Sequence, residues 1–326
     1  MSPNNFSPSR IPSPCAALCC FALFALAGGL SGFAAAQTAP VPPAAAAAVA
    51  PTTLPPMNGI AHIAIRVKDI AASLDFYHKL GFDQAFANTS ADGTVTQSFV
   101  KLNDRQFFEL YPVTARDTQV GFMHLCFEAG DINALHDYYI AQGLTPIPVR
   151  KAAAGNLLFT LQGPQQFPGP PNSLGSSTIS AQNIEYTQYM PGSRHTLDFG
   201  QHLSPDRVAD KMTVVALAMQ DPAAAQMFYL SKLSFTQSKI YPDRLDLPGA
   251  SGQQIEIVPA ATLAAKSSII LESSNLDKAA AQLTRQQVAF QRADSSYTDA
   301  RGRTVHVQMI SVTDPDGNII RIQAAQ

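Results

Sequence analysis

The sequence predicts an α+β fold in which one unit, a strand followed by a helix and three more short strands, occurs four times. Three observations support this prediction. Four apolar runs end at a residue that suits a helix N-cap, namely Asp69, Asp131, Asp221 and Asn275. Short runs of strand-forming residues follow the helical patterns. The segment 65–82 is similar to the segment 217–235, which indicates that the second half of the chain repeats the first.

The first unit has the best-defined boundaries. Asp69 suits the N-cap of a helix whose apolar residues recur at helical spacing over 70–80, and Gly81 is a suitable stop. The strand-like runs Thr96–Leu102 and Gln106–Tyr111 follow. We therefore expect a strand, a helix and further strands in this order.

The other three units contain the same elements. The helix of the second unit ends at Gly143, and Pro222 suits the first helical position of the third. In the last unit, a helix through Gln286 is followed by strand-like runs at 305–312 and 318–323. The sequence Asp-Pro-Asp-Gly-Asn between these two runs is a strong turn signal.

The composition excludes some functions and indicates how the fold is stabilised. Charged residues make up 14% of the chain and the net charge is −2. Lys and Arg form no stripe, so we expect no nucleic-acid partner. Hydrophobic residues make up 46% of the 326 residues, enough for the cores of two domains. Only Cys126 lies outside the N-terminal apolar segment, so core packing and not an internal disulfide must stabilise the fold.

The N-terminal segment has the parts of a secretory signal in the right order. Arg10 supplies positive charge, residues 15–30 form an apolar run, and Ala34–Ala36 offer small residues for cleavage. We therefore expect residues 1–36 to be a signal peptide that is cleaved after Ala36. The mature protein would then be periplasmic or secreted, without a membrane span. The alternative interpretation is an uncleaved membrane anchor.

Composition and repeat boundaries together predict the domains. Residues 37–56, rich in Ala and Pro and uncharged, form a linker. We expect a first domain over 57–192, a linker over 193–211 and a second domain over 212–326. The Pro/Gly-rich segment 163–177 predicts a loop, which either shapes substrate access or is a tolerated surface insertion.

Strand alternation selects four candidate metal ligands. Successive side chains of a strand point to opposite faces, and four predicted strands carry one metal-binding residue type opposite their apolar face. These residues are His62, Glu109, His124 and Glu185. Considered one at a time, such residues usually have packing or surface roles. Together, two imidazoles and two carboxylates suit one divalent ion of Zn, Ni, Co, Mn or Fe(II).

The repeated units, the strand–Val-x-Asp–helix–Phe-Tyr openings and the Asp-Pro-Asp-Gly-Asn turn resemble the vicinal-oxygen-chelate superfamily. This superfamily includes glyoxalase I, extradiol dioxygenases and bleomycin-resistance proteins. The resemblance covers nearly all of residues 57–326. It implies two tandem glyoxalase-like domains, each a curved mixed sheet with helices outside. It also implies that the four candidate residues are metal ligands, because the set is similar to that of bacterial glyoxalase I.

The second half lacks this ligand set. The matching positions hold Val214, Glu256, Ser268 and Arg321. Among these, only Glu256 can bind a metal, so we expect a degenerate site in the second domain. Extradiol dioxygenases typically bind their metal in the second pair of units, and the placement here is reversed.

The resemblance implies further roles near the ligands. Glyoxalase I has an Arg at the place of Arg66 that binds a substrate carboxylate, while a rim salt bridge is the alternative interpretation. Val113 stands where glyoxalase I usually has Asn, which argues against lactoylglutathione lyase activity. Cys126 is expected to pack beside the site. We interpret the isolated histidines as structural: His195, His202 and His306.

The function implied by the resemblance is metal-assisted proton transfer. The expected enzyme is a lyase or isomerase of the glyoxalase type that chelates two vicinal oxygens of a small substrate and stabilises an enediolate. Glu185 or Glu109 would act as the base. Two other hypotheses stay open. One is an Fe(II) dioxygenase with His62, His124 and Glu185 as ligands, and the other is a non-catalytic protein that sequesters a small molecule.

Overall fold

The computed structural model describes residues 52–165, 181–249, 252–263, 268–298 and 302–325, and residues 48–326 form one compact unit. In the first half, the described elements are β1 (Met57–Val67), α1 (Ile70–Lys79), β2 (Gln84–Thr89), β3 (Val95–Lys101), β4 (Phe107–Pro112), β5 (Gly121–Ala129), α2 (Ile132–Ala141), β6 (Arg150–Lys151), β7 (Leu157–Gln165), β8 (Ala181–Gln188) and α3 (Arg194–Leu197).

The second half repeats this order. Its described elements are β9 (Lys211–Met219), α4 (Pro222–Lys232), β10 (Thr236–Gln237), β11 (Arg244–Asp246), β12 (Gln254–Pro259), α5 (Ala260–Leu263), β13 (Ser268–Ser273), α6 (Leu276–Arg285), β14 (Gln291–Thr298), β15 (Thr304–Thr313) and β16 (Ile319–Ala324).

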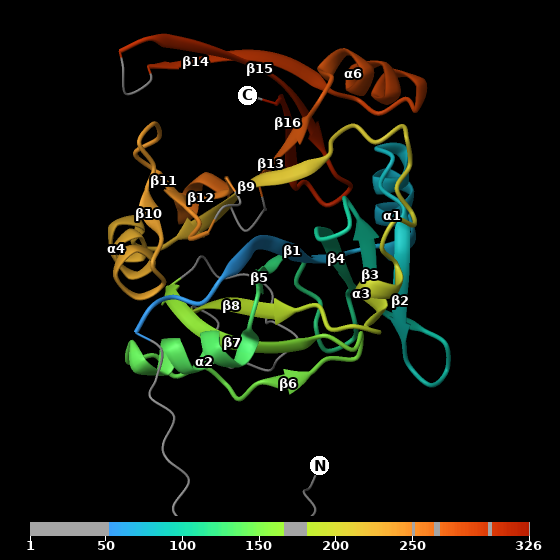
Figure 1. The fold of residues 1–326 in the computed structure, drawn as a ribbon. Coiled ribbons are helices and arrows are strands. Elements are labelled where there is room, and N and C mark those ends of the chain that lie inside the picture. The colour runs from blue at the N-terminus through green and yellow to red at the C-terminus, as the bar shows by residue number, and fades with distance from the viewer. Residues whose placement is uncertain (1–51, 166–180, 250–251, 264–267, 299–301, 326) are drawn as a thin grey trace, which may run out of the picture. The chain divides into compact units, whose positions relative to one another are not determined.

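Each half forms one eight-stranded mixed sheet (Figure 1). The strand order is β2-β3-β4-β1-β5-β8-β7-β6 in the first sheet and β10-β11-β12-β9-β13-β16-β15-β14 in the second. The central strands β1 and β5 are antiparallel, and each has a parallel neighbour, β4 or β8. The strands β9 and β13 have the same arrangement with β12 and β16. The predicted α+β fold of four βαβββ units in two tandem domains is therefore confirmed.

The helix boundaries follow from local chemistry. The predicted N-cap side chains accept hydrogen bonds from backbone N–H groups of the first turn in all four cases: Asp69, Asp131, Asp221 and Asn275. Gly81 and Gly143 follow α1 and α2 with φ of +82° and +78°. This left-handed conformation favours glycine and ends a helix.

The hydrophobic core lies on the helix-covered face of each sheet. In β1, Ile63, Ile65 and Val67 are at most 1% exposed. Tyr77 of α1 is fully buried, and its ring centroid lies 4.7 Å from that of Phe108 in β4. Burial of each such side chain stabilises the fold by roughly 1.5–3 kcal/mol. The opposite face of the same strands carries polar residues together with a smaller apolar cluster that includes Ala61, Phe99 and Phe107.

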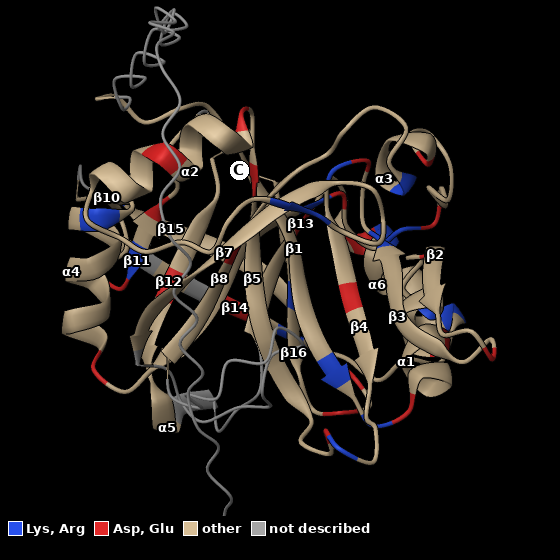
Figure 2. Ribbon diagram, turned by 90° about the horizontal axis from the view of Figure 1, so that it is seen from below, with Lys and Arg blue, Asp and Glu red and all other residues tan. Residues whose placement is uncertain are grey.

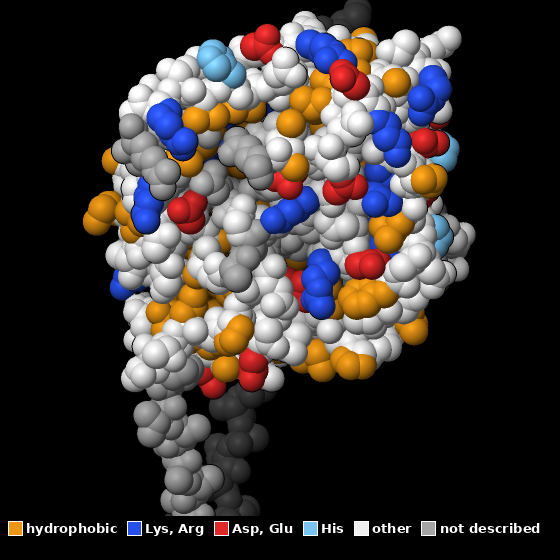
Figure 3. Space-filling view, turned by 45° about the horizontal axis from the view of Figure 1, so that its top comes forward, with side chains coloured by type: hydrophobic (Ala, Val, Ile, Leu, Met, Phe, Trp, Pro, Cys, Tyr) orange, Lys and Arg blue, Asp and Glu red, His pale blue; other side chains and the backbone are white. Residues whose placement is uncertain are grey.

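Charged residues lie on strands as well as on helices and connecting segments (Figure 2). On the face shown in Figure 3, acidic and basic side chains are interspersed. Among the described residues, no helix has the length and apolarity to span a membrane. The predicted signal peptide 1–36 and most of the linker 37–56 lie outside the described residues, as does the predicted loop beyond its first residues, 163–165, which belong to β7.

Candidate metal centre

The four candidate ligands lie on the four central strands of the first sheet. His62 is on β1, Glu109 on β4, His124 on β5 and Glu185 on β8. The pairing register aligns them, since Ala64 of β1 lies opposite Glu109 on one side and opposite His124 on the other. All four ligand side chains are at most 6% exposed. The fold thus brings together all four residues that were selected from the sequence.

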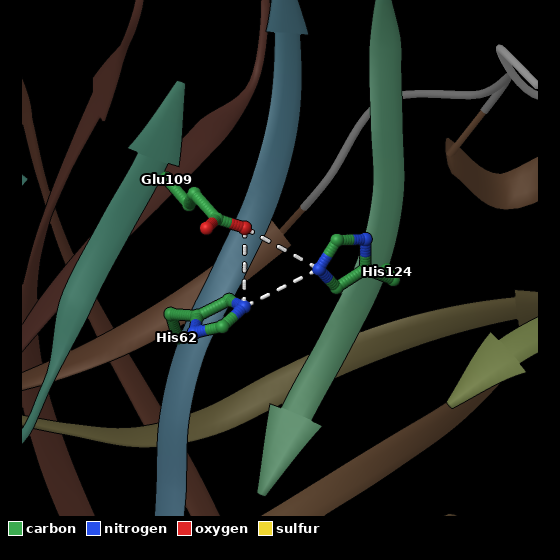
Figure 4. A group of neighbouring side chains, drawn as sticks. All are labelled: His62, Glu109 and His124. Atoms are coloured by element: carbon green, nitrogen blue, oxygen red, sulfur yellow. Dashed lines mark hydrogen bonds and ion pairs between the residues drawn. The ribbon is translucent and has the colours of Figure 1, made fainter. Parts of the chain in front are cut away.

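The nitrogen and oxygen atoms of these side chains converge. His62 Nε2 lies 3.2 Å from Glu109 Oε2 and 3.4 Å from Glu185 Oε1. His124 Nε2 lies 3.4 Å from Glu109 Oε2 and 3.9 Å from Glu185 Oε2. The two Nε2 atoms are 3.2 Å apart. Figure 4 shows His62, Glu109 and His124 reaching toward one another from β1, β4 and β5.

This spacing fits a divalent ion. Nitrogen and oxygen ligands lie about 2.0–2.2 Å from an ion such as zinc, so two ligands of one ion are about 3.0–3.5 Å apart. Glu109 Oε2 is buried and has no hydrogen-bond partner among the described residues, although both imidazoles lie close to it. Leaving a buried carboxylate oxygen unpaired is costly. A bound cation would supply the missing partner.

The electrostatics of the cluster also favour a cation. Burial lowers the pKa of His62, but the Glu109 and Glu185 carboxylates outweigh burial and raise this pKa above its ordinary value. Burial acts to raise the pKa of Glu109, yet His62 and His124 hold the pKa of this carboxyl well below its usual range. Glu109 is therefore a carboxylate at neutral pH, the form that binds metal.

Gln97 of β3 fixes the orientation of Glu109. Its Nε2 donates hydrogen bonds to Glu109 Oε1 and, at 2.7 Å, to the hydroxyl oxygen of Tyr111. With Oε1 held in this way, Oε2 is directed at the two histidines. Sequence reasoning missed Gln97. The available signal was its place in a predicted strand next to the one that carries Glu109, but the register between these strands was not fixed by the sequence.

Cys126 of β5 lies close enough to join the cluster, because its Sγ and one ligand atom each of His62 and Glu185 all lie within 4.8 Å of one another. It is the register partner of Glu185 and is fully buried. Burial raises the pKa of the Cys126 thiol well above its ordinary value, and the charges of Glu185 and Glu109 add to the effect. Without a metal ion the thiol therefore stays protonated at neutral pH. It packs in a small apolar cluster with Ala61 and Phe107.

His62, Glu109 and Glu185 line a cavity of about 290 Å³. This volume suits a small molecule. The rest of its wall combines apolar residues, namely Phe99, Leu158 and Ala152–Ala154, with the polar residues Asn88, Gln97, Tyr111, Arg150, Asn156 and His195. His195 was interpreted as structural from its isolated position in the sequence, but the fold places it at this cavity.

Arg66 lies outside the lining of this cavity. It is 3% exposed, on β1, four residues beyond His62, and its Nη2 lies 3.9 Å from Asp117 Oδ2. Four residues along a strand correspond to about 13 Å. The pair with Asp117 agrees with the alternative interpretation as a salt bridge, while Arg66 Nε and Nη1 are buried without a partner among the described residues. Substrate binding by Arg66 stays a prediction.

The second sheet repeats the register of the first without its ligands. Ala216 of β9 lies opposite Glu256 and Ser268, as Ala64 lies opposite Glu109 and His124. Arg321 lies opposite Ile270, as Glu185 lies opposite Cys126. At these positions Arg321 donates a hydrogen bond to Ser268 Oγ at 3.0 Å, and Arg244 lies 4.0 Å from Glu256.

Comparison with known proteins supports the same fold. The crystal structure of the Mn(II)-bound glyoxalase from Novosphingobium aromaticivorans matches with a TM-score of 0.59 and 15% identity, covering 83% of each chain. The 2,3-dioxygenase LapB from Pseudomonas sp. KL28 matches with a TM-score of 0.58 and 12% identity, covering 84% of this chain and 94% of the dioxygenase. Homoprotocatechuate 2,3-dioxygenase from Brevibacterium fuscum, in complex with 3,4-dihydroxyphenylacetate, matches with a TM-score of 0.53 and 13% identity, covering 85% of this chain and 83% of that one.

These identities establish a common fold and leave the activity open. No curated protein matches the chain by sequence. One family does match, over the segment that carries His62, Glu109 and His124. Residues 59–167 match the model of the Glyoxalase/Bleomycin resistance protein/Dioxygenase superfamily.

Proposed function

We propose that the chain is an exported, divalent-metal-dependent lyase or isomerase of the glyoxalase type. The observation that carries this proposal is the convergence of two buried imidazoles and two buried carboxylates, at 3.2–3.9 Å, beside a small cavity that His62, Glu109 and Glu185 line. The N-terminal apolar run supports export. His62, Glu109, His124 and Glu185 would hold the ion.

The ion, when bound, supplies positive charge that stabilises negative charge developing on two adjacent substrate oxygens. The protein residues then divide the remaining work. Gln97 fixes Glu109 against the two histidines, so Glu109 serves as a permanent ligand. Glu185 makes the longest contact of the cluster, 3.9 Å to His124. Glu185 is therefore better placed to leave the cluster, remove a proton from a carbon next to a carbonyl group and return it.

A second candidate is a dioxygenase reaction. One specific observation favours it: His62, His124 and Glu109 form the tightest triad, and two histidines with one carboxylate suit Fe(II) oxygenases. The sequence-based version of this hypothesis used Glu185 as the carboxylate, whereas the distances select Glu109. In this case Glu185 would be a base beside the metal.

Both candidate reactions require a bound divalent metal, so metal content tests them together. Protein purified without chelator should contain roughly one divalent ion per chain, as expected for a single four-ligand site. We expect His124→Ala and Glu109→Gln each to lower metal affinity by about a hundredfold. Residues that only hydrogen-bond to a metal ligand already contribute about 10–100-fold, and a ligand itself should contribute at least as much. Glu256→Gln, which changes the matching position of the second sheet, is the control and should keep its metal. Unchanged metal content in His124→Ala would contradict the proposal.

Two simple probes then separate the reactions. Hydroxyacetone in D2O reports proton removal next to a carbonyl group, because NMR detects exchange at the hydroxymethyl carbon. Catechol with an oxygen electrode reports dioxygenase chemistry. We expect exchange that requires the metal and is lost in Glu185→Gln, whose amide oxygen can still contact a cation but cannot accept the proton. Oxygen consumption without exchange would favour the second candidate.

A further inference from the structure

His195 is a buried imidazole in the wall of the cavity. It belongs to the short helix α3, which follows the first sheet, and it is 2% exposed. Neither Nδ1 nor Nε2 has a hydrogen-bond partner among the described residues. Leaving such a group unpaired inside a protein costs roughly 1–3 kcal/mol. A phenyl ring would fill the same space without this cost, so packing alone does not account for a histidine.

The surroundings of His195 are aromatic. Its ring stacks on Tyr189 with a centroid distance of 4.4 Å and an interplanar angle of 16°. Phe86, Phe99 and Phe107 each meet it edge to face at 5.0–5.2 Å. Burial lowers the pKa of His195 to about 3. The ring is therefore neutral near pH 7 and offers one N–H donor and one lone-pair acceptor.

The segment around His195 is held firmly in place. The Arg194 guanidinium donates hydrogen bonds to Ala87 O at 2.7 Å and to Asn88 Oδ1 at 3.0 Å, and it lies 4.6 Å from the centre of the Phe86 ring. The Arg194 backbone N–H donates to Ala154 O at 2.8 Å. These contacts join α3 to β2 on one side and to the turn between β6 and β7 on the other. The orientation of the imidazole is thus fixed before any ligand arrives.

Asn156 adds a second unpaired group to the same wall. It is 4% exposed, its Nδ2 donates to Thr187 Oγ1 at 2.6 Å, and its Oδ1 has no partner among the described residues. The turn that carries Asn156 packs directly on the segment of His195, because a Cβ atom at Gly155 would lie 3.2 Å from Ser193 Cα. Two neighbouring segments therefore place residues with buried, unpaired polar atoms in the wall of the cavity that His62, Glu109 and Glu185 also line.

We propose that His195 and Asn156 form a recognition site for an uncharged hydroxyl group of the substrate. This hydroxyl is separate from the two oxygens that the metal would bind. The substrate class is then a small molecule that offers two adjacent oxygens to the metal and carries a further hydroxyl group. A hydroxyl donates to Asn156 Oδ1 or to the bare imidazole nitrogen and accepts from the imidazole N–H, so it satisfies both side chains. This inference rests on the proposed metal-dependent function.

Matched hydroxamates provide the test, because a hydroxamate chelates a metal through two adjacent oxygens. A series with a terminal hydroxyl on chains of one, two and three carbons is compared with methyl-terminated analogues of equal length. Affinity for the zinc-loaded protein is measured by calorimetry. We expect at least one hydroxyl-bearing member to bind roughly five- to tenfold more tightly than its analogue, the value of one or two hydrogen bonds.

Three variants decide the origin of this preference. His195→Phe keeps the aromatic packing and should abolish the preference for the hydroxyl-bearing hydroxamate. His195→Gln should retain part of this preference, because Gln still offers a donor and an acceptor. His78→Phe, on the exposed face of α1, is the control and should behave as the wild type. Metal content should be unchanged in all three. If the wild type binds metal but prefers no hydroxyl-bearing member, or if His195→Phe keeps the preference, the recognition site is refuted and the metal site stands. If the wild type binds no metal, both proposals fail.

Discussion

Lys101 at the end of β3 offers the sharpest test of how the segment after the first sheet is anchored. Its side chain is fully buried. Its Nζ lies 2.8 Å from Asp198 Oδ2 and 2.8 Å from Asp104 Oδ1, and it donates to Asp198 O at 2.5 Å. Asp198 caps the C-terminal end of α3 and also contacts His202 Nδ1 at 2.6 Å. The ammonium group therefore connects β3 to the helix that carries His195.

Replacing Lys101 with Met keeps the volume of the side chain but leaves Asp198 buried without its cation. Removing one partner of a buried ion pair costs about 3–5 kcal/mol. His202 still contacts Asp198, so we expect a loss near the lower end, about 3 kcal/mol in the free energy of unfolding. In the double variant Lys101→Met/Asp198→Asn no buried charge is left unpaired. It should recover about 2 kcal/mol of the summed single losses.

Urea unfolding followed by circular dichroism measures these values. Lys79→Met is the matched control, because Lys79 forms a 2.6 Å pair with Asp75 in which both side chains are well exposed. An exposed pair of this kind contributes at most about 0.5 kcal/mol. A loss below about 1 kcal/mol in Lys101→Met, or full additivity in the double variant, would refute the assigned role of the pair.

Three further predictions follow from other parts of the chain. Burial lowers the pKa of His195 from 6.5 to about 3, so below pH 6.5 only the unfolded chain takes up the proton, and the unfolding free energy decreases as the pH falls toward 3. Between pH 7 and pH 5 the wild type should lose about 2 kcal/mol more of its unfolding free energy than His195→Phe, and equal losses in urea titrations would contradict the buried neutral ring. Gly81→Ala should destabilise the fold by more than about 2 kcal/mol, because the residue has φ of +82° and the new Cβ would lie 2.7 Å from the backbone of Arg207. Gly143→Ala, with φ of +78° and open space around it, should cost only about 1 kcal/mol in the same denaturation assay, and similar costs for both variants would show that the close approach is unimportant. N-terminal sequencing of the exported protein should begin at Gln37, whereas an intact Met1 would indicate an anchor.

The sequence was sufficient to select the four clustered residues because they obey a simple period. His62, Glu109 and His124 lie in strands whose apolar residues alternate with them, so one buried face fixes the direction of every second side chain. The helix caps were equally accessible, since an Asp or Asn before a helical pattern has a local cause. These features depend on a few neighbouring residues.

The positions of other residues around the site depend on contacts between distant segments. His195 lies in a stretch without periodic pattern, and only the contacts of Arg194 with Ala87 and Asn88 bring it to the cavity. Alternation placed Arg66 on the face of His62, but it does not say how far along the strand the cavity extends. Gln97 required the register between β3 and β4, which is set by the packing of the whole sheet.

Because the two sheets share one register, the ligand set of the first sheet can be transferred to the second by substitution. Val214, Ser268 and Arg321 occupy the positions of His62, His124 and Glu185. The triple variant Val214→His/Ser268→His/Arg321→Glu, with the native Glu256, would reproduce the ligand set on a backbone that already has the right pairing. A second bound ion would show that four positions suffice to specify the centre. A single ion would show that supporting groups such as Gln97, which the second sheet lacks at the equivalent strand, belong to the minimal design.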